Sequence, residues 1–287
     1  MRIYSFFKDF FFQKEILYLQ DDSSFDLALK DLESNDVLAI DTEFIWKNTY
    51  YPKLSLIQIS TYKKIYVLDC LFLNISKLEK IFRDKSILKI FHSIRGDVSV
   101  LSNSLGLKIE NIFDTQLAED ILNKNKGDQI SYKKLVKKYF FKEISKSETN
   151  SNWERRPLKA KQIDYAAEDV RYLHSIMEIQ KRKLISLRKI NLFNVACEKE
   201  KRLGEEDFSI SRLRRYIKKN KNINDREIEI FNWRENQAKK INIPPSHIIE
   251  DRDLKKLKKI LEIGNINEFK WIIKKDSSRA EFINTFL

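Results

Sequence analysis

Two acidic side chains close an apolar segment, VLAIDTEF at residues 37–44, that is typical of a buried strand. In an extended chain Asp41 and Glu43 lie on one face, while Thr42 and Phe44 lie on the other, where Phe44 can join a core. Neighbouring carboxylates repel each other and raise each other's pKa unless a cation lies between them. Alone the pair is a weak signal, because acidic pairs are common and most are solvated at the surface. Its position at the end of an apolar strand, rather than in a loop, strengthens the case for a cation site.

Asp169 and Asp97 are two further candidate ligands. Asp169 follows Tyr165 by four residues in a helix expected over residues 160–185, so the phenol and the carboxylate share one face. Asp97 begins a helix expected over residues 97–105, directly after an expected strand. Taken singly, the first pattern is more typical of an amphipathic helix with a surface pair, and the second of a residue that stabilises a helix N-terminus.

Cysteine and histidine offer no alternative metal site. Cys70 and Cys197 lie far apart and form no CxxC pair, which excludes a disulfide scaffold and a cysteine zinc site and fits a reducing cytoplasm. The chain has only three histidines, so a histidine site is not expected either. If this protein binds a metal, carboxylates must hold it.

The elements that would position these residues alternate between strands and helices. Besides residues 37–44, strands are expected over 54–60, 65–69 and 87–91, and helices over 71–83, 97–105, 132–140 and 160–185, with another helix capped by Asp114. From about residue 208 only helical spacing occurs. The pattern predicts an α/β fold with a mixed sheet flanked by helices, followed by a small all-α domain.

The chain of 287 residues carries a formal net charge of +13, and residues 181–225 alone carry +8. This basic connector favours a polyanion partner, although Lys-rich helices that are merely well solvated are equally consistent with it. No apolar run approaches the roughly 20 residues of a membrane span. Charges interrupt the apolar start, MRIYSFFKDFFFQKEI, and no small-residue cleavage site follows, so we expect no signal peptide.

Together the acidic segments resemble the DEDD exonucleases. DTEF at 41–44, HSIRGD at 92–97 and YAAED at 165–169 match the three motifs of that family in order, and the tyrosine is typical of its DEDDy branch. The flanking sequences narrow the resemblance to bacterial ribonuclease D: TYYPKLSLIQIS at 49–60, FDTQLAEDIL at 113–122 and SNWERRPLKAKQIDYAAEDVRYL at 151–173. The resemblance covers roughly residues 17–180 and implies an RNase H-like fold.

The resemblance also implies two domains. Residues 1–204 would form the exonuclease domain, with the basic helical connector from about residue 181, and residues 205–287 resemble an HRDC domain, a helical nucleic-acid-binding module. The sequence departs from the family at two points. Ribonuclease D commonly carries two HRDC domains, and this chain has room for one. Lys159 stands where the family usually has a Ser or Thr cap before the helix of Tyr165.

The chemistry implied by the resemblance is hydrolysis of phosphodiesters from RNA 3′ ends with two divalent ions, Mg²⁺ or Mn²⁺, releasing 5′-mononucleotides. Asp41, Glu43 and Asp169 would hold one ion, and Asp41 would bridge to the second, which Asp97 reaches directly or through water. Tyr165 would orient the attacking water, because a phenol with an ordinary pKa of about 10 is a poor general base. The implied partners are tRNA precursors and other small RNAs. The resemblance also implies a monomer that is located in the cytoplasm and binds no membrane.

Six residues near these motifs are candidate substrate contacts: Thr42, Phe44, His92, Trp153, Arg155 and Arg156. For His92 a satisfied structural role is the stronger alternative, and for Trp153 core packing is equally consistent. Two other functions remain open at this point, a 3′–5′ exonuclease acting on DNA and a non-catalytic nucleic-acid-binding module. The complete set of carboxylates disfavours the module, since a pure binder gains nothing from clustered negative charge.

Overall fold

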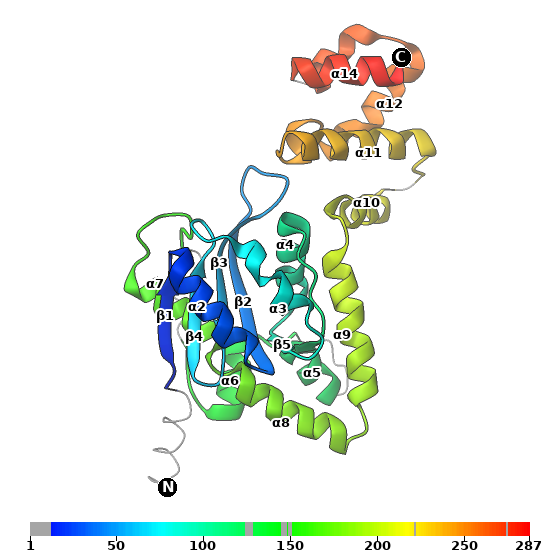
Figure 1. The fold of residues 1–287 in the computed structure, drawn as a ribbon. Helices are drawn as coiled ribbons and strands as arrows, with labels where there is room; N and C mark the ends of the chain where they lie inside the picture. The colour runs from blue at the N-terminus through cyan, green and yellow to red at the C-terminus, as the bar shows by residue number, and fades with distance from the viewer. Residues whose placement is uncertain (1–12, 124–128, 145–147, 149–150, 221, 274) are drawn as a thin grey trace. The chain divides into compact units, whose positions relative to one another are not determined.

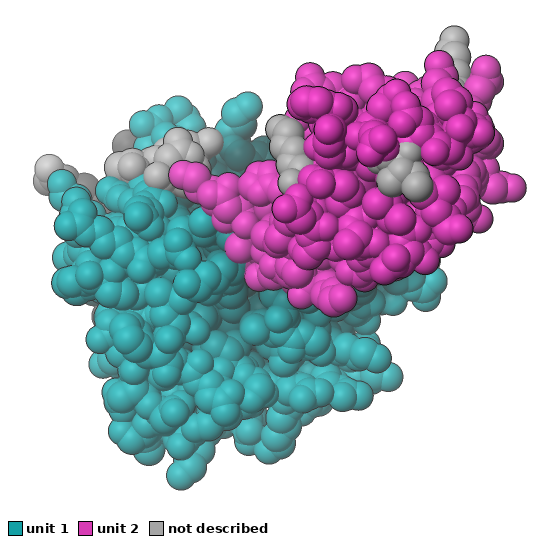
Figure 2. Space-filling model, turned by 90° about the horizontal axis from the view of Figure 1, so that it is seen from above, with its two compact units in different colours: residues 1–45, 53–205 teal, residues 46–52, 206–287 magenta. Residues whose placement is uncertain are grey.

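The computed structural model describes residues 13–123, 129–144, 148, 151–220, 222–273 and 275–287. They form two compact units, one of residues 1–45 and 53–205 and the other of residues 46–52 and 206–287 (Figure 2). Most of the apolar N-terminal segment that we examined as a signal peptide lies outside the described residues. In the described part of the chain no helix is both long enough and apolar enough to span a membrane.

A six-stranded mixed sheet forms the centre of the first unit (Figure 1). Its strand order is β1-β4-β3-β2-β5-β6; β2 pairs antiparallel with β3 and β3 with β4, and the other pairs are parallel. The strands are β1 (Glu15–Leu19), β2 (Val37–Ile45), β3 (Lys53–Ser60), β4 (Lys64–Asp69), β5 (Leu88–Phe91) and β6 (Ile112–Asp114). The α/β fold class and four of the strands are therefore confirmed. β1 and β6 were not expected from the sequence, and the three residues of β6 are too few to show a period.

Helices cover both faces of the sheet and define two cores. Along β2, Leu38 and Ile40 join one core, and Ala39 between them joins the other, as strand alternation requires. The first core includes side chains of α2 (Asp22–Glu33), α3 (Glu79–Arg83) and α4 (Arg95–Leu105). The second includes side chains of α5 (Thr115–Leu122), α6 (Tyr132–Phe140), α7 (Ala160–Arg171), α8 (Leu173–Ser186) and α9 (Ile190–Glu205). By the same alternation, Asp41 and Glu43 face the α7 side.

The helix expected over residues 160–185 is in fact two, α7 and α8, with the break at Tyr172. The hydroxyl of Tyr132 donates to the carbonyl of Glu168 at 2.9 Å and accepts from the N–H of Tyr172 at 3.1 Å. It thus takes the place of the direct bond between these two groups that would continue the helix. The helix expected over residues 71–83 likewise differs, since a 3₁₀ turn, η1 (Ile75–Leu78), precedes the short α3.

The second unit is helical, as expected for the C-terminal region, apart from the loop that it takes from the first half of the chain. Its main helices are α10 (Phe208–Lys219), α11 (Asp225–Lys240), α12 (Leu254–Ile263), α13 (Phe269–Ile272) and α14 (Asp276–Phe286), joined through the 3₁₀ turns η2 (Pro245–His247), η3 (Asp251–Asp253) and η4 (Ile266–Glu268). Tyr50 is fully buried in its core and donates its hydroxyl to Glu235 at 3.0 Å. The guanidinium of Arg212 lies 4.4 Å from the centre of the Tyr50 ring.

Candidate active site

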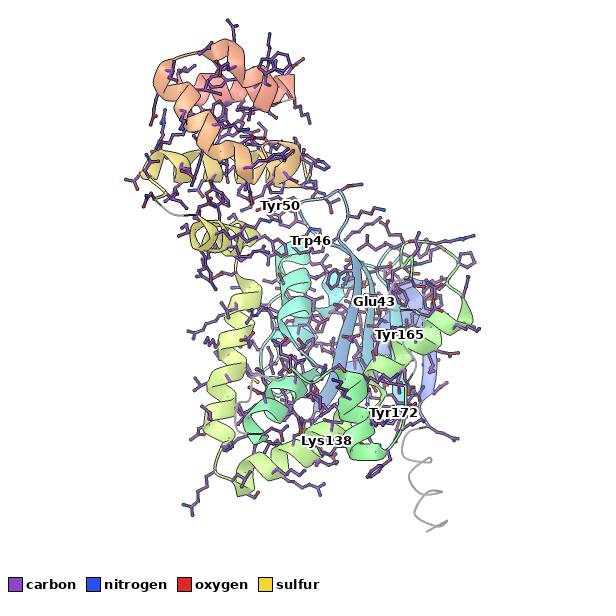
Figure 3. All side chains as sticks on the ribbon, turned by 180° about the vertical axis from the view of Figure 1, so that it is seen from behind. Glu43, Trp46, Tyr50, Lys138, Tyr165 and Tyr172 are labelled. Atoms are coloured by element: carbon purple, nitrogen blue, oxygen red, sulfur yellow. The ribbon has the colours of Figure 1, made fainter. Side chains whose placement is uncertain are left out.

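Asp41, Glu43 and Asp169 form the acidic group of the first unit. Each offers a carboxylate oxygen, and these three oxygens lie within 4.8 Å of one another. The two strand residues come from the end of β2, and Asp169 comes from α7, which packs against β2, β3 and β4. The small, fully buried side chains of Ala166 and Ala167 let this helix approach the sheet closely. Figure 3 labels Glu43 on the sheet and Tyr165 on the helix.

The electrostatics of this group fit a cation. Burial, followed by repulsion from Asp41, Asp169 and Asp97, raises the pKa of Glu43 to about 9. The pKa of Asp41 is raised well above its ordinary value by burial and by Asp169, and burial and Glu168 raise that of Asp169 to about 7. No ion pair among the described residues neutralises any of the three. Partly buried, mutually repelling oxygen ligands are what a hard divalent ion requires.

Asp97 lies outside this group of three and reaches the site from the other side of the sheet. It belongs to α4, is 7% exposed, and accepts a hydrogen bond of 2.5 Å from the hydroxyl of Thr42. Burial, and next the charge of Asp41, raises its pKa well above the ordinary value. Asp41 is therefore in electrostatic contact with carboxylates from both faces of the sheet. Thr42, which we expected at the substrate, is buried beside Asp97 as its hydrogen-bond donor, and its contact with substrate stays a prediction.

Tyr165 lies beside the acidic group. Its hydroxyl hydrogen-bonds to Asp169, which opposes the rise in that carboxyl's pKa. Its ring lies 6.0 Å from that of Trp153, centre to centre, with the planes inclined at 38°. The phenol thus stands next to the candidate cation site, held on one side by a carboxylate and on the other by a buried indole.

With this geometry established, comparison with known proteins identifies the family. Residues 17–185 match the family model described as 3′-5′ exonuclease. The chain belongs to that family. The expected resemblance to ribonuclease D is also confirmed, since ribonuclease D of Desulfotalea psychrophila is 35% identical over 232 residues, which are 75% of this chain and 59% of that protein. The chain therefore spans about three fifths of the length of this curated relative.

Solved structures share the fold of this chain. The crystal structure of Escherichia coli RNase D, described as an exoribonuclease involved in structured RNA processing, superposes with a TM-score of 0.82 at 23% identity, over 96% of this chain and 73% of that one. Brucella melitensis NrnC with bound Mg²⁺ superposes with a TM-score of 0.54 at 25% identity, over 67% of this chain and 91% of that one. The RNase H-like α/β architecture expected from the sequence agrees with the first of these.

Several of the expected substrate contacts have structural partners in this chain. Both ring nitrogens of His92 are engaged, Nδ1 with the hydroxyl of Thr115 at 2.9 Å and Nε2 with the carbonyl of Ile130 at 3.1 Å, and burial lowers its pKa to about 4. Trp153 is 2% exposed, and Phe44 packs against the first core. Arg156 pairs with the buried Asp69. Among the six, Arg155 has an exposed side chain.

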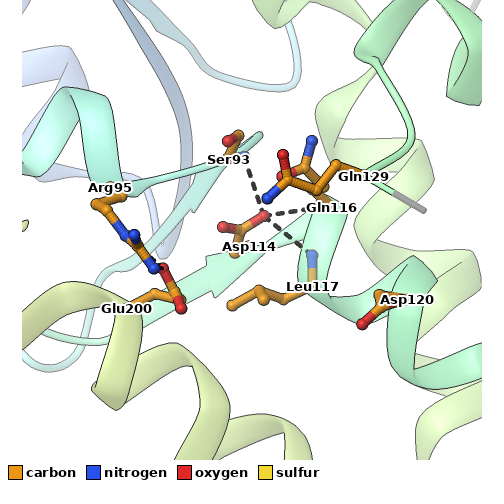
Figure 4. Close-up of a pocket in the computed structure, with 8 residues that line it drawn as sticks. All are labelled: Ser93, Arg95, Asp114, Gln116, Leu117, Asp120, Gln129 and Glu200. Atoms are coloured by element: carbon orange, nitrogen blue, oxygen red, sulfur yellow. Dashed lines mark hydrogen bonds and ion pairs between the residues drawn. The ribbon is translucent and has the colours of Figure 1, made fainter. Parts of the chain in front are cut away.

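Two further residues lie beside the candidate site without having been expected there. Asp114, anticipated only as a helix cap, accepts the N–H groups of Gln116, Leu117 and Ser93 (Figure 4). It also accepts the N–H of Ile94, which like Ser93 lies in the turn before Asp97. A polar pocket of about 260 Å³ lies beside it, and its lining residues include none of the proposed catalytic ones. Gln58 is fully buried opposite Asp41, and in the described structure its side-chain amide lacks a hydrogen-bond partner. The available signal was a glutamine between two isoleucines of β3.

Proposed function

We propose that this chain is a 3′–5′ exoribonuclease that hydrolyses phosphodiesters at RNA 3′ ends and releases 5′-mononucleotides, with tRNA precursors among its substrates. The observation that carries the proposal is the convergence of Asp41, Glu43 and Asp169 in a 3′–5′ exonuclease fold. The similarity to ribonuclease D supports RNA as the substrate. Cys70 and Cys197 are both free thiols, as a reducing compartment favours, which is consistent with a cytoplasmic enzyme.

Four carboxylates divide between two ions in this proposal. Asp41, Glu43 and Asp169 would hold one, and Asp41 with Asp97 the other. When bound, two divalent ions supply an activated water and charge stabilisation of the leaving 3′ oxygen. The Mg²⁺ in the related Brucella structure supports Mg²⁺, and an all-oxygen ligand set also accepts Mn²⁺. Tyr165, fixed through its hydrogen bond to Asp169, orients the attacking water.

The second unit serves as the RNA-binding module in this proposal, as an HRDC-like domain would. A cleft of about 520 Å³ in this unit supports the proposal, because basic residues predominate among the charged residues that line it. The basic residues are Arg212, Arg215, Lys219, Arg234 and Arg252, and the acidic one is Asp251. Arg212 and Arg234 are engaged with Glu235, whereas neither Arg215 nor Lys219 has an acidic partner among the described residues. Two exposed cations one helical turn apart suit successive phosphates of a strand.

Hydrolysis of matched RNA and DNA oligonucleotides of one sequence by the purified chain tests the enzymatic proposal. We expect stepwise shortening of the RNA from its 3′ end, loss of activity in EDTA, and recovery with Mg²⁺ or Mn²⁺. Asp41→Ala, which removes the ligand common to both ions, should abolish turnover while RNA binding persists. Preference for DNA, full turnover in EDTA, or binding without hydrolysis under any metal would each contradict the proposal.

A further inference from the structure

Asp69, at the end of β4, is a fully buried carboxylate in the first unit that the proposed chemistry does not use. It receives hydrogen bonds from the hydroxyl of Tyr18, from the N–H of Leu71 at 3.1 Å, and from Arg156, whose Nε and Nη2 reach its two oxygens. Burial alone would raise its pKa, but the bonds from Arg156 and Tyr18 hold the pKa below its ordinary value. The carboxylate is therefore ionised, and Arg156 is fixed to it at two points.

The same guanidinium also holds the chain segment before α7. Arg156 Nη1 donates to the carbonyl of Trp153 at 2.6 Å, and Nη2 lies 3.2 Å from the hydroxyl of Ser55. That hydroxyl donates to the same Trp153 carbonyl. The backbone of Trp153 is thus tied to β3 through Ser55 and to β4 through Arg156 and Asp69.

Trp153 transmits this fixed position to the candidate active site. Its indole is buried in the second core, and its ring contacts that of Tyr165. The position of the indole limits how far the phenol can turn away from Asp169. Because misplacement of a catalytic group by about 1 Å can cost a factor of about 100 in rate, a support of this kind has a kinetic consequence.

We propose that the Asp69–Arg156 pair is a positioning device for Tyr165, acting through Trp153. Arg156 is then a positioning residue, which replaces the substrate contact expected from the sequence. The inference rests on the proposed function, because it assigns to the pair a task in the water-orienting step. It requires the forked guanidinium, since a lysine at this position could reach either the carboxylate or the Trp153 carbonyl but lacks the geometry to fix both.

A double-mutant cycle between Arg156→Lys and Tyr165→Phe tests the inference in the full-length chain with Mg²⁺. We expect Arg156→Lys to lower kcat about tenfold with little change in KM, and to have almost no further effect once the Tyr165 hydroxyl is absent. Unchanged kcat in Arg156→Lys, or the same tenfold loss in both backgrounds, would overturn it. The second result would show that Arg156 acts independently of the Tyr165 hydroxyl.

Two carboxylate-to-amide variants separate positioning from general loss of stability. Asp69→Asn keeps the shape of the side chain and should reproduce the loss in kcat, which provides a second route if Arg156→Lys does not fold. Glu119→Gln is the matched control, because Glu119 is 1% exposed and bonded to Lys138, Tyr139 and Gln180, away from Trp153. It should lower the melting temperature but not kcat. Equal effects of the two variants on kcat would contradict the inference, whereas an inactive wild-type chain would contradict the proposed function itself.

Discussion

Asp41 is the residue on which the candidate site depends most, because it interacts with carboxylates from both faces of the sheet. Asp169 contributes to the raised pKa of Asp41, and Asp41 in turn raises the pKa of Asp97. Asp97 has a second anchor in Thr42, and Asp169 has one in Tyr165. Each outer carboxylate is therefore held by a hydroxyl, and individual substitutions should have distinct consequences.

Removing the hydroxyl of Tyr165 should slow the reaction without weakening the metal site. We expect Tyr165→Phe to reduce kcat about 100-fold, because the orientation of the attacking water is lost while all four carboxylates remain. Single-turnover rates at several Mg²⁺ concentrations measure both effects. Tyr62→Phe is a matched control that deletes a hydroxyl bonded to Glu178. A wild-type rate for Tyr165→Phe would mean that this tyrosine only packs the helix.

The repulsion among the carboxylates should make stability of the metal-free protein depend on pH. The pKa values of Glu43 and Asp169, about 9 and about 7, lie above their unfolded values, so the folded state binds protons more tightly. The contribution of these two groups to stability should then be largest at low pH and be lost as pH rises from about 5 to about 9. Because Mg²⁺ relieves the repulsion, it should raise the Tm more at about pH 8.5 than at about pH 6.

Melting curves of wild type and Asp169→Asn, in EDTA and in Mg²⁺, measure this dependence. The variant lacks one of the repelling charges and should show a flatter decline with pH and a smaller gain from Mg²⁺. If Tm changed with pH in the same way in both proteins, Asp169 would not repel the other carboxylates, and the prediction would be wrong. The difference between the proteins is the relevant quantity, since other groups titrate in both.

At the scale of elements, α7 carries two of the candidate residues but begins with an incomplete cap. Gln162 accepts the N–H of Lys159 at 3.0 Å, which is one half of a capping box, but the side chain of Lys159 makes no capping hydrogen bond. The family's usual Ser or Thr at this position would supply the other half. The fully buried Ala166, Ala167 and Val170 hold the helix on the sheet instead.

Completing this cap should stabilise the first unit. We expect Lys159→Ser to add about 1 kcal/mol to the free energy of unfolding, because its hydroxyl can accept an unpaired N–H of the first turn. The matching rise in Tm is about 2 °C for a unit of this size. Lys161→Ser, one residue inside the helix, removes the same charge without creating a cap and should give no gain. Equal gains from both variants would assign the effect to charge.

At the scale of the whole molecule, residues 46–52 form a loop that belongs to the second unit, so truncation of the chain at residue 205 would not remove that unit cleanly. Trp46 and Tyr50 pack against Phe208, at 4.7 Å and 6.5 Å between ring centres, and Tyr50 also bonds Glu235. Deleting residues 206–287 would therefore remove the side chains against which this loop packs and expose its aromatic residues. Point substitutions in the cationic cleft avoid this difficulty and are the better test of RNA binding by this unit.

Replacing Arg215 and Lys219 together by alanine should weaken binding of a structured RNA and reduce its salt dependence. Each lost phosphate contact lowers the slope of log K against log salt by about 0.7 for a single strand and about 0.9 for a duplex, so we expect a decrease of about 1.4 to 1.8. Anisotropy titrations in EDTA measure this without hydrolysis. Lys218→Ala with Lys275→Ala removes two exposed charges of the same unit outside the cleft. Equal slopes for the two double variants would exclude the cleft as the binding surface.

Local spacing in the sequence was sufficient to predict which candidate residues share a face. The alternation of residues 37–44 placed Asp41 and Glu43 together, and the interval of four placed Tyr165 beside Asp169. The mixed sheet could be predicted for the same reason, since buried strands of six to nine residues show their period within a short window. Short-range geometry of the backbone determines all of these features.

The tertiary structure alone decided which residues meet across long intervals. Thr42 bonds Asp97 over 55 residues, Arg156 pairs with Asp69 over 87, and Tyr50 joins Glu235 over 185. From the sequence we expected Arg156 to contact the substrate, because it precedes the helix that carries Tyr165 and Asp169. No local pattern shows that the buried carboxylate of Asp69, at the end of β4, lies beside it. Such pairings depend on how the two cores close around the sheet, so burial and charge compensation are properties of the folded chain rather than of any segment.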